Sequence, residues 1–200
     1  MGRKNKSAEK REQIVAAFCD CAVDLGIEKA SMGEVAARVG IDRSTMHYYF
    51  KTREQLVIEA AKYITRFYTE RIAATMATLD PRNKSHALVE SLFSAAVHDE
   101  RKSSLLDELG ALGNREPFFR EQVKSVYSGI ETEVSRVLDE TLPAAIPPKE
   151  RRLLAQALMQ LSEGVTVFVA LDFNRTWRLA ARQAGLQLLD NLLTKYAPEG

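Results

Sequence analysis

The sequence has few of the residues and runs that mark secreted, membrane or metal-binding proteins. Among 200 residues there are only two cysteines, Cys19 and Cys21. The two cysteines lie two positions apart in a predicted helix, so their side chains point about 200° apart around the axis. They therefore cannot form a disulfide with each other. No apolar run approaches the roughly 18 residues of a membrane-spanning helix, and the start MGRKNKSAEKREQ lacks the apolar core of a secretory signal. We therefore expect a cytoplasmic chain without a metal site.

Net charge is also small, but it is unevenly distributed. The 28 Lys and Arg residues nearly balance the 27 Asp and Glu residues, which leaves a formal charge of +1. Residues 1–53 contain 10 Lys and Arg against 7 Asp and Glu, so the remaining residues carry 18 against 20. A basic segment before a neutral to acidic one is typical of a nucleic-acid-binding module attached to a domain that does not bind nucleic acid. A difference this small needs support from the positions of individual residues.

Apolar residues at three- and four-residue spacing are present along nearly the whole chain. This spacing predicts helices, because it places apolar side chains on one helical face, whereas the β-branched alternation of strands is scarce. We predict an all-α fold with an N-terminal helix-turn-helix domain of three helices over residues 1–53. A long fourth helix joins it to a C-terminal helical domain over residues 54–200. Start and stop residues predict about nine helices, over residues 7–25, 31–39, 42–48, 52–79, 85–99, 103–112, 117–141, 149–171 and 175–196.

Residues 31–56, SMGEVAARVGIDRSTMHYYFKTREQL, carry the most specific pattern in the chain. Ser31 and Glu34 form a capping box at the start of one short helix, and Gly40 makes a tight turn after its end. Asp42 is placed to cap a second short helix. Two short helices joined by a tight turn are the frame of a helix-turn-helix. The side chains expected to face inward are Val35, Ala36, Val39, Ile41, Met46 and Phe50.

The outward face of the second short helix is polar and cationic. In a major groove, an arginine can donate to guanine, hydroxyl groups can reach base edges or phosphates, and phenols can reach the backbone. A short polar helix is more often only a solvated surface. Here the turn, the caps, the polar face and a basic flank agree at fixed spacing, which favours a DNA-recognition helix. The outward residues are Arg43, Ser44, Thr45, His47 and Tyr48, followed by Lys51 and Arg53.

Residues 7–56 resemble the DNA-binding domain of the TetR/AcrR family of bacterial transcriptional regulators. The family pattern runs from a small residue and a glycine, through hydroxyl or basic residues and an aromatic pair, to Phe and a Lys-Ser/Thr-Lys-Glu sequence before Leu. It is met here by Ala36, Gly40, Arg43 to Thr45, His47 to Phe50, Lys51 to Glu54 and Leu56. The chain departs from it at His47, where Tyr is commoner, and at Arg53, where Lys is usual.

The resemblance implies which residues touch DNA. Base or phosphate contacts fall on Arg43, Ser44, Thr45, His47 and Tyr48, and contacts near the backbone on Tyr49, Lys51 and Arg53. Ser31 would present its hydroxyl group and the first amides of its helix to a phosphate, a role that also suits the positive end of a helix dipole. The resemblance further implies an effector pocket in the C-terminal domain and a four-helix dimer interface made by the last two helices.

The apolar pattern of the last two helices agrees with such an interface. Both helices are apolar over a wide arc, which indicates burial on more than one side. Gly164 and Gly185 lie in mid-helix, where glycine costs about 1 kcal/mol relative to alanine, and this suggests a close approach of backbones, between subunits or within one. The residues predicted to form the interface are Leu154, Leu158, Leu161, Gly164, Val165, Gly185, Leu186, Leu189 and Leu193.

The C-terminal helices also contain more large apolar and aromatic side chains than a simple helix seam uses. Some are predicted to line a cavity with a few polar groups that orient a ligand, although each one could instead be close-packed core. The predicted pocket residues are Phe93, His98, Phe118, Phe119, Tyr127, Met159, Gln160, Phe168 and Trp177. We expect a small hydrophobic or aromatic effector that releases a homodimeric repressor from a palindromic operator.

Two other classes of protein fit parts of the sequence. A helical-bundle enzyme could use His86 with Glu90, or His98 with Asp99, as metal ligands, but the sequence lacks a second ligand pair, a nucleophile motif and a phosphate-binding glycine loop. We therefore expect no catalytic residue, cofactor or metal. A DNA-binding protein without an effector would need no pocket, and no metabolite would stabilise it.

Overall fold

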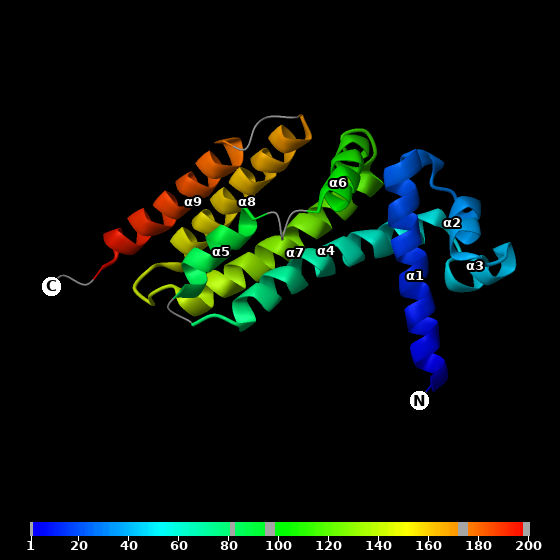
Figure 1. Ribbon diagram of the computed structural model, residues 1–200, viewed down its shortest axis with the longest axis horizontal. Helices are drawn as coiled ribbons and strands as arrows, with labels where there is room; N and C mark the ends of the chain where they lie inside the picture. The colour runs from blue at the N-terminus through cyan, green and yellow to red at the C-terminus, as the bar shows by residue number, and fades with distance from the viewer. Residues whose placement is uncertain (1, 81–82, 95–98, 172–175, 198–200) are drawn as a thin grey trace. The chain divides into compact units, whose positions relative to one another are not determined.

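The computed structural model describes residues 2–80, 83–94, 99–171 and 176–197, and every regular element in these ranges is helical (Figure 1). The prediction of an all-α fold is confirmed. Among these helices, none is both long and apolar enough to cross a membrane. The elements are α1 (Gly2–Leu25), the short 3-10 helix η1 (Ile27–Lys29), α2 (Met32–Val39), α3 (Arg43–Tyr49), α4 (Arg53–Ala77), α5 (Lys84–Leu92), α6 (Glu100–Gly113), α7 (Pro117–Thr141), α8 (Pro148–Ala170) and α9 (Thr176–Lys195).

Most predicted helix ends agree with the structure within three residues, and two differ by more. α1 begins at Gly2, so Ser7 lies inside the helix and does not cap it. Extending a helix costs much less than starting one, and residues 3–6 include no helix breaker. α5 ends at Leu92, where the prediction ran to residue 99. The Ser91 hydroxyl donates to the carbonyl of Leu88 and that of Ser94 to the carbonyl of Ser91, and such bonds compete with helix continuation.

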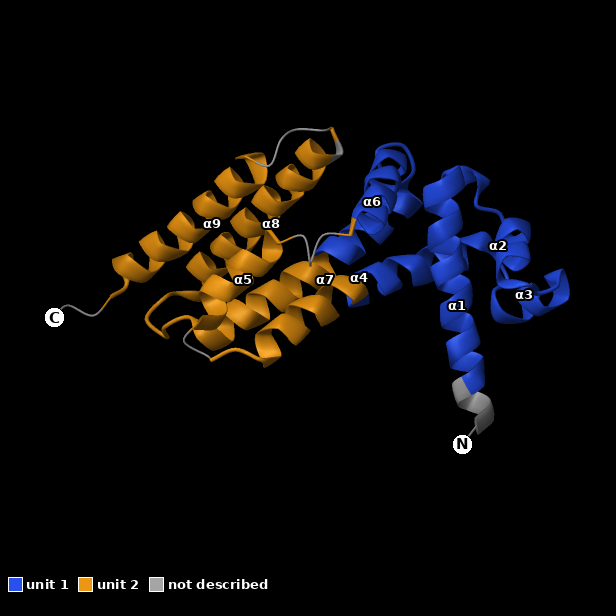
Figure 2. Ribbon diagram, in the orientation of Figure 1, with its two compact units in different colours: residues 1–66, 100–127 blue, residues 67–99, 128–200 orange. Residues whose placement is uncertain are grey.

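The described chain forms two compact units (Figure 2). Unit 1 contains residues 1–66 and 100–127, and unit 2 contains residues 67–99 and 128–200. Helices α4 and α7 therefore each run from one unit into the other. The units cut across the predicted boundary after residue 53, because residues 54–66 and 100–127 pack with the N-terminal helices. Compact units need not coincide with functional domains, so the predicted division of function stays a prediction.

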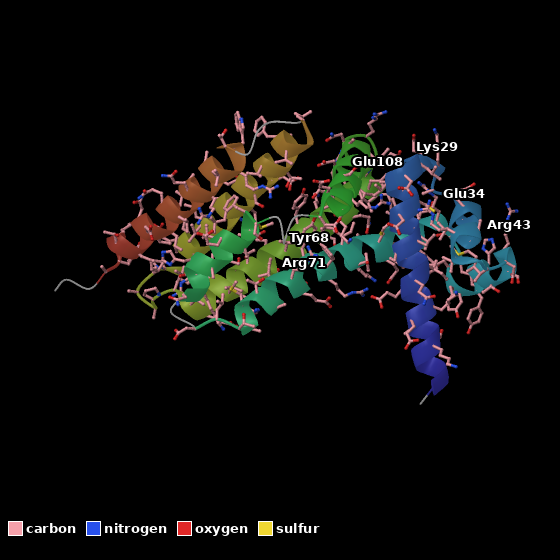
Figure 3. All side chains as sticks on the ribbon, viewed as in Figure 1. Lys29, Glu34, Arg43, Tyr68, Arg71 and Glu108 are labelled. Carbon is pink, nitrogen blue, oxygen red and sulfur yellow. The ribbon has the colours of Figure 1, made fainter. Side chains whose placement is uncertain are left out.

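In unit 1, α1 packs against α2 and α6, and α2 packs against α3. Polar contacts attach α6 to the end of α1 and to η1. The Glu108 carboxylate, labelled on α6 in Figure 3, accepts a hydrogen bond of 2.6 Å from the Ile27 amide. The Arg101 guanidinium donates to Asp24 at 2.9 Å and to Asp20 at 3.3 Å. Both cysteines are buried free thiols. These contacts hold the helix-turn-helix on a frame that includes α6.

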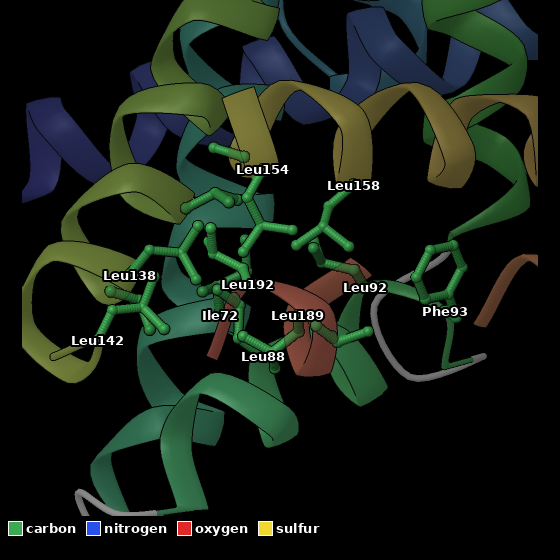
Figure 4. Close-up of a cluster of buried hydrophobic side chains, with 14 of the residues drawn as sticks. Ile72, Leu88, Leu92, Phe93, Leu138, Leu142, Leu154, Leu158, Leu189 and Leu192 are labelled. Carbon is green, nitrogen blue, oxygen red and sulfur yellow. The ribbon is translucent and has the colours of Figure 1, made fainter. Parts of the chain in front are cut away.

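The core of unit 2 is aliphatic and draws on all of its helices (Figure 4). α9 packs against α8 and α5. Two polar contacts also join α5 to α9: an ion pair of Glu90 with Arg182, and a hydrogen bond of 2.8 Å between Nε2 of His86 and Asp190. The labelled core side chains are Ile72 from α4, Leu88 and Leu92 from α5, Phe93, Leu138 from α7, Leu142, Leu154 and Leu158 from α8, and Leu189 and Leu192 from α9.

Candidate nucleic-acid interface

The first short helix of the predicted helix-turn-helix, α2, begins and ends as its sequence requires. The Ser31 side chain accepts a hydrogen bond of 3.2 Å from the amide of Glu34. Gly40 follows the helix with φ 70° and ψ 40°, in the left-handed region that glycine adopts without steric cost. Val35 and Ala36 are buried, as predicted. This turn sets the direction in which the chain enters α3.

The second short helix, α3, is capped by Asp42. One carboxylate oxygen accepts from the Thr45 amide at 2.8 Å and from the Ser44 hydroxyl at 2.5 Å, and the other accepts from the Thr45 hydroxyl at 2.8 Å. These three donors hold the pKa of Asp42 well below its ordinary value. Met46 and Phe50 are buried beneath the helix. The inward side of α3 therefore holds the fold, while its polar side is turned away from the core.

The predicted DNA-contacting side chains of α3 form one accessible surface. Arg43, Ser44, His47 and Tyr48 are exposed, and the exposed fraction of Tyr48 is 72%. Thr45 and Tyr49 are half-buried. The rings of the two tyrosines pack edge to face, with centroids 5.1 Å apart. A phenol this exposed has little role in the core and is free to meet another molecule.

Ser31, which caps α2, and Arg43 on α3 lie near each other, although 12 positions separate them in sequence. Both come close to Gly33, where a Cβ atom would stand 3.6 Å from the Ser31 hydroxyl oxygen and 3.7 Å from Nη2 of Arg43. Arg43 is labelled in Figure 3. A hydroxyl group, a guanidinium and the first amides of α2 thus gather at one place, where a phosphate oxygen would find several donors.

The two cationic residues after α3 are placed differently. Lys51 is exposed, and its amide donates to the side chain of Gln55 at 2.8 Å at the start of α4. Arg53 is half-buried and donates from Nε to the carbonyl of Ala30 at 3.3 Å and from Nη2 to that of Ile27. Arg53 thus ties α4 to η1 in the free protein. Its contact with DNA stays a prediction.

Arg11 was not predicted from the sequence, yet it holds the end of α3. Its guanidinium lies 4.2 Å from the centre of the Phe50 ring, donates to the carbonyl of Tyr49 at 2.7 Å and faces Glu59 at 3.8 Å. The partners lie 38 or more positions away, so no local pattern could reveal them. Arg11 therefore positions α3 against α1 and α4.

Residues 14–60 match the sequence pattern of bacterial regulatory proteins of the tetR family, over the same helices that form this surface. This N-terminal segment is of the tetR family. The resemblance noted in the sequence is confirmed, and so is its implication that the protein is a transcriptional regulator.

Similarity to known regulators extends along most of this chain. The transcriptional regulator BetI of Cronobacter sakazakii is 26% identical over 94% of this chain and 93% of its own length. The nicotine-responsive transcriptional repressor HdnoR of Paenarthrobacter nicotinovorans is 22% identical over 80% and 84%. A transcriptional regulator of Saccharomonospora viridis, solved in complex with choline, has the same fold with a TM-score of 0.69, 18% identity and coverage of 92% and 96%. These relatives are regulators and not enzymes, in agreement with the expectation for this chain.

The predicted pocket residues are distributed over both units. In unit 1, Phe119 is buried, Phe118 and Tyr127 are half-buried, and the two phenylalanine rings pack edge to face with centroids 5.2 Å apart. In unit 2, Phe168 and Trp177 stack with centroids 4.2 Å apart. The predicted pocket therefore stays a prediction.

Three further pocket residues lie in unit 2, and His98 lies outside the described residues. Phe93 is close-packed core, since the Cβ position of Gly185 is only 3.0 Å from its ring. Met159 is half-buried. Gln160 is exposed in a groove between α8 and α9, so it lies apart from the buried Phe93. For Phe93 the structure therefore favours the alternative of close-packed core over a place in the pocket.

The predicted dimer-interface residues divide into two groups, and the structure corrects one of them. Leu154, Leu158, Val165, Gly185 and Leu189 are buried inside one protomer. A side chain that is already covered by its own chain cannot also bury surface against a partner, so these five are core residues. The other four, Leu161, Gly164, Leu186 and Leu193, are half-buried and keep accessible surface. The sequence could not separate these two groups, because both helices are apolar on several sides. That α8 and α9 form a dimer interface stays a prediction.

The metal ligands considered for an enzyme have other partners. His86 pairs with Asp190, and Glu90 pairs with Arg182. Throughout the part of the chain that the structure describes, no three His, Cys, Asp or Glu side chains are grouped to hold a metal ion. His86 and Glu90 thus join α5 to α9.

Proposed function

We propose that this chain is a homodimeric, ligand-responsive repressor that binds a palindromic operator through α3 and leaves it when a small hydrophobic effector binds. The observation that carries the proposal is the accessible polar and cationic surface of α3, which sits on a buried apolar base. One recognition helix reads too few base pairs for a specific site, whereas a two-fold dimer places two of them about 34 Å apart on one face of DNA. Acting on chromosomal DNA places the protein in the cytoplasm.

An exposed apolar face on α8 and α9 supports the dimer. Leu153, Ala157, Gln160, Gly164, Val167 and Leu171 recur at three- and four-residue spacing and share one side of α8. Leu153 and Leu171 are 60% and 64% exposed. On α9, Ala184 and Leu188 line the adjoining groove of about 550 Å³. Leucines this exposed are better covered by the same face of a second copy, as in a four-helix interface.

Two relatives support a small-molecule effector, since one is named as nicotine-responsive and another was solved with choline. In this chain, α4 and α7 are each shared by both compact units. A ligand that prefers one arrangement of these helices would change the DNA affinity by its difference in affinity for the two arrangements. A coupling of about 1–3 kcal/mol lowers operator affinity roughly 5–150-fold.

DNA binding is tested by selecting operators from a random duplex library and measuring affinity for the selected site. Tyr48→Ala should weaken binding roughly 5–100-fold without unfolding the protein. Lys51→Ala should weaken binding to all sequences and reduce the slope of log affinity against log salt by about 0.9. Lys62→Ala is the matched control, because this exposed lysine on α4 pairs with Glu59 at 2.9 Å and should not touch DNA. Unchanged binding in both α3-region variants would contradict the assignment.

The dimer is tested by the mass in solution of two variants. Leu188→Glu places a charge in the groove and should give a 22.4 kDa monomer that is still helical. Leu179→Glu is the matched control, because this exposed leucine lies about 180° around α9 from Leu188. A wild-type protein that is monomeric at micromolar concentration and binds its operator would contradict the dimer.

The effector is tested with a thermal-shift screen of small hydrophobic and aromatic compounds. A compound that stabilises the protein should lower operator affinity when titrated into the complex. A tightly bound compound without effect on DNA affinity would contradict ligand-controlled release. Specific DNA binding in a protein that no compound stabilises would instead favour a DNA-binding protein without an effector.

A further inference from the structure

The carboxylate of Asp42 controls two of the hydroxyl groups on the proposed DNA-reading surface. Ser44 donates to one carboxylate oxygen at 2.5 Å, and Thr45 donates to the other at 2.8 Å. The amide of Thr45 shares the first oxygen with Ser44, at 2.8 Å. All three contacts come from residues 42–45, so they depend on no other element once α3 has formed.

The direction of these hydrogen bonds follows from charge. An ionised carboxylate can only accept, so each hydroxyl must donate its single hydrogen to Asp42. The same three donors lower the pKa of Asp42, which keeps the carboxylate ionised at neutral pH. Both hydroxyl oxygens are then left with lone pairs only, and toward any further partner they act as acceptors.

An acceptor in the major groove distinguishes the two orientations of a base pair. Adenine N6 and cytosine N4 are donors there, whereas thymine O4 and guanine O6 and N7 are acceptors. Phosphate oxygens are acceptors as well. We propose that Asp42 is a specificity-determining residue, which turns Ser44 and Thr45 into acceptors and so makes them favour adenine or cytosine, over thymine or guanine, on the strand that they face. This inference rests on the proposed function, since it requires α3 to lie in the groove.

The substitution Asp42→Asn separates the two hydroxyl groups. In the variant, the side-chain oxygen of asparagine must face the Thr45 amide, because that amide can only donate. The Ser44 hydroxyl donates to this same position, so it keeps its acceptor. The NH2 group then takes the place of the oxygen that accepts from the Thr45 hydroxyl. Because NH2 is a donor, Thr45 must accept from it and its own hydrogen is released toward the groove. Ser44 keeps its acceptor and serves as an internal control.

The experiment selects operators from a randomised duplex library with the wild-type protein and with Asp42→Asn. Thr45→Val and Ser44→Ala identify the operator positions that each hydroxyl faces, since each should lose its preference there. We expect Asp42→Asn to change the base preference at the Thr45 position from adenine or cytosine toward thymine or guanine, by at least about fivefold. The preference at the Ser44 position should be unchanged.

Each result has a distinct meaning. An Asp42→Asn protein that selects the same bases as the wild type at the Thr45 position overturns the inference, and so does a wild-type preference for thymine or guanine there. If Asp42→Asn fails to fold by circular dichroism, Thr45→Val decides, because an unchanged selection by this variant would also overturn the inference. A wild-type protein that selects no sequence at all contradicts the proposed function instead.

Discussion

Gly185 on α9 is packed so closely that adding one methyl group should destabilise the protein. A Cβ atom at this position would lie 3.0 Å from Leu158, 3.0 Å from Phe93 and 3.1 Å from Val89. Carbon atoms in ordinary contact are about 3.5–4.0 Å apart, so each neighbour would have to move by about 0.5 Å. All three are at most 2% exposed. They have little room to move, and they belong to two different packed elements, since Val89 and Phe93 lie in and directly after α5 and Leu158 lies in α8.

The size of the effect is the difference between two opposing contributions. Overpacking of a close-packed core costs about 1–3 kcal/mol. Alanine in mid-helix recovers about 0.5–1 kcal/mol relative to glycine, because it restricts the unfolded chain. We therefore expect Gly185→Ala to reduce the free energy of unfolding by about 1–2 kcal/mol, which lowers the melting temperature by about 2–4 °C per kcal/mol.

Urea unfolding followed by circular dichroism measures this change, and the fluorescence of Trp177, the single tryptophan, reports on α9 itself. Gly110→Ala on α6 is the control, because no atom lies within 4 Å of its Cβ position and only the helix-forming gain of about 0.5–1 kcal/mol remains. A Gly185→Ala protein as stable as the wild type would refute the reasoning, since it would show that the three neighbours can retreat without cost.

Three further predictions concern single side chains. Arg53→Ala should reduce the free energy of unfolding by about 1–3 kcal/mol, because two backbone carbonyls lose a charged donor. Arg53→Lys should restore only part of this loss, since an ammonium group lacks the forked guanidinium that reaches both carbonyls. An Arg53→Ala protein as stable in urea as the wild type would contradict this. Glu108→Ala should reduce the free energy of unfolding by about 1–3 kcal/mol, because it removes the acceptor of the Ile27 amide. Glu108→Gln retains an acceptor and should reduce it by less. Equal losses of stability for the two variants in thermal unfolding would argue against the hydrogen bond. Burial raises the pKa of the Cys19 thiol from 9.0 to about 12, so this thiol ionises first in the unfolded chain, and stability should fall above pH 9 by up to about 1.4 kcal/mol per pH unit. Cys19→Ala should reduce this fall without abolishing it, because burial also raises the pKa of the Cys21 thiol. Identical pH profiles of the two proteins would count against the prediction.

The sequence by itself determined the features that depend on residues within about four positions of each other. Ser31 and Asp42 cap their helices, and Gly40 takes the left-handed turn between them. Pro117 and Pro148 stand at helix starts. The exposed polar side of α3 could be predicted for the same reason, because a helix of seven residues with buried Met46 has a defined outer face. Local hydrogen bonds and helical periodicity are present in any one segment, so they can be read without the rest of the chain.

The tertiary structure alone decided which side of each C-terminal helix meets its own chain. Leu154 and Leu153 are neighbours of the same type, yet the exposed fraction is 5% for one and 60% for the other. When a helix is apolar on several sides, its sequence does not show which side packs against its own chain. Gly164 and Gly185 are likewise alike in sequence, but only Gly185 has close neighbours.

Long-range partners explain the remaining differences between prediction and structure. Arg53, predicted to lie near DNA, donates to carbonyls 23 and 26 positions before it in the chain. Arg11 holds the end of α3 from 38 positions away. Such contacts exist only after helices distant in sequence have packed together, because the energy that selects them comes from burial and geometry in three dimensions and leaves no periodic trace in the chain.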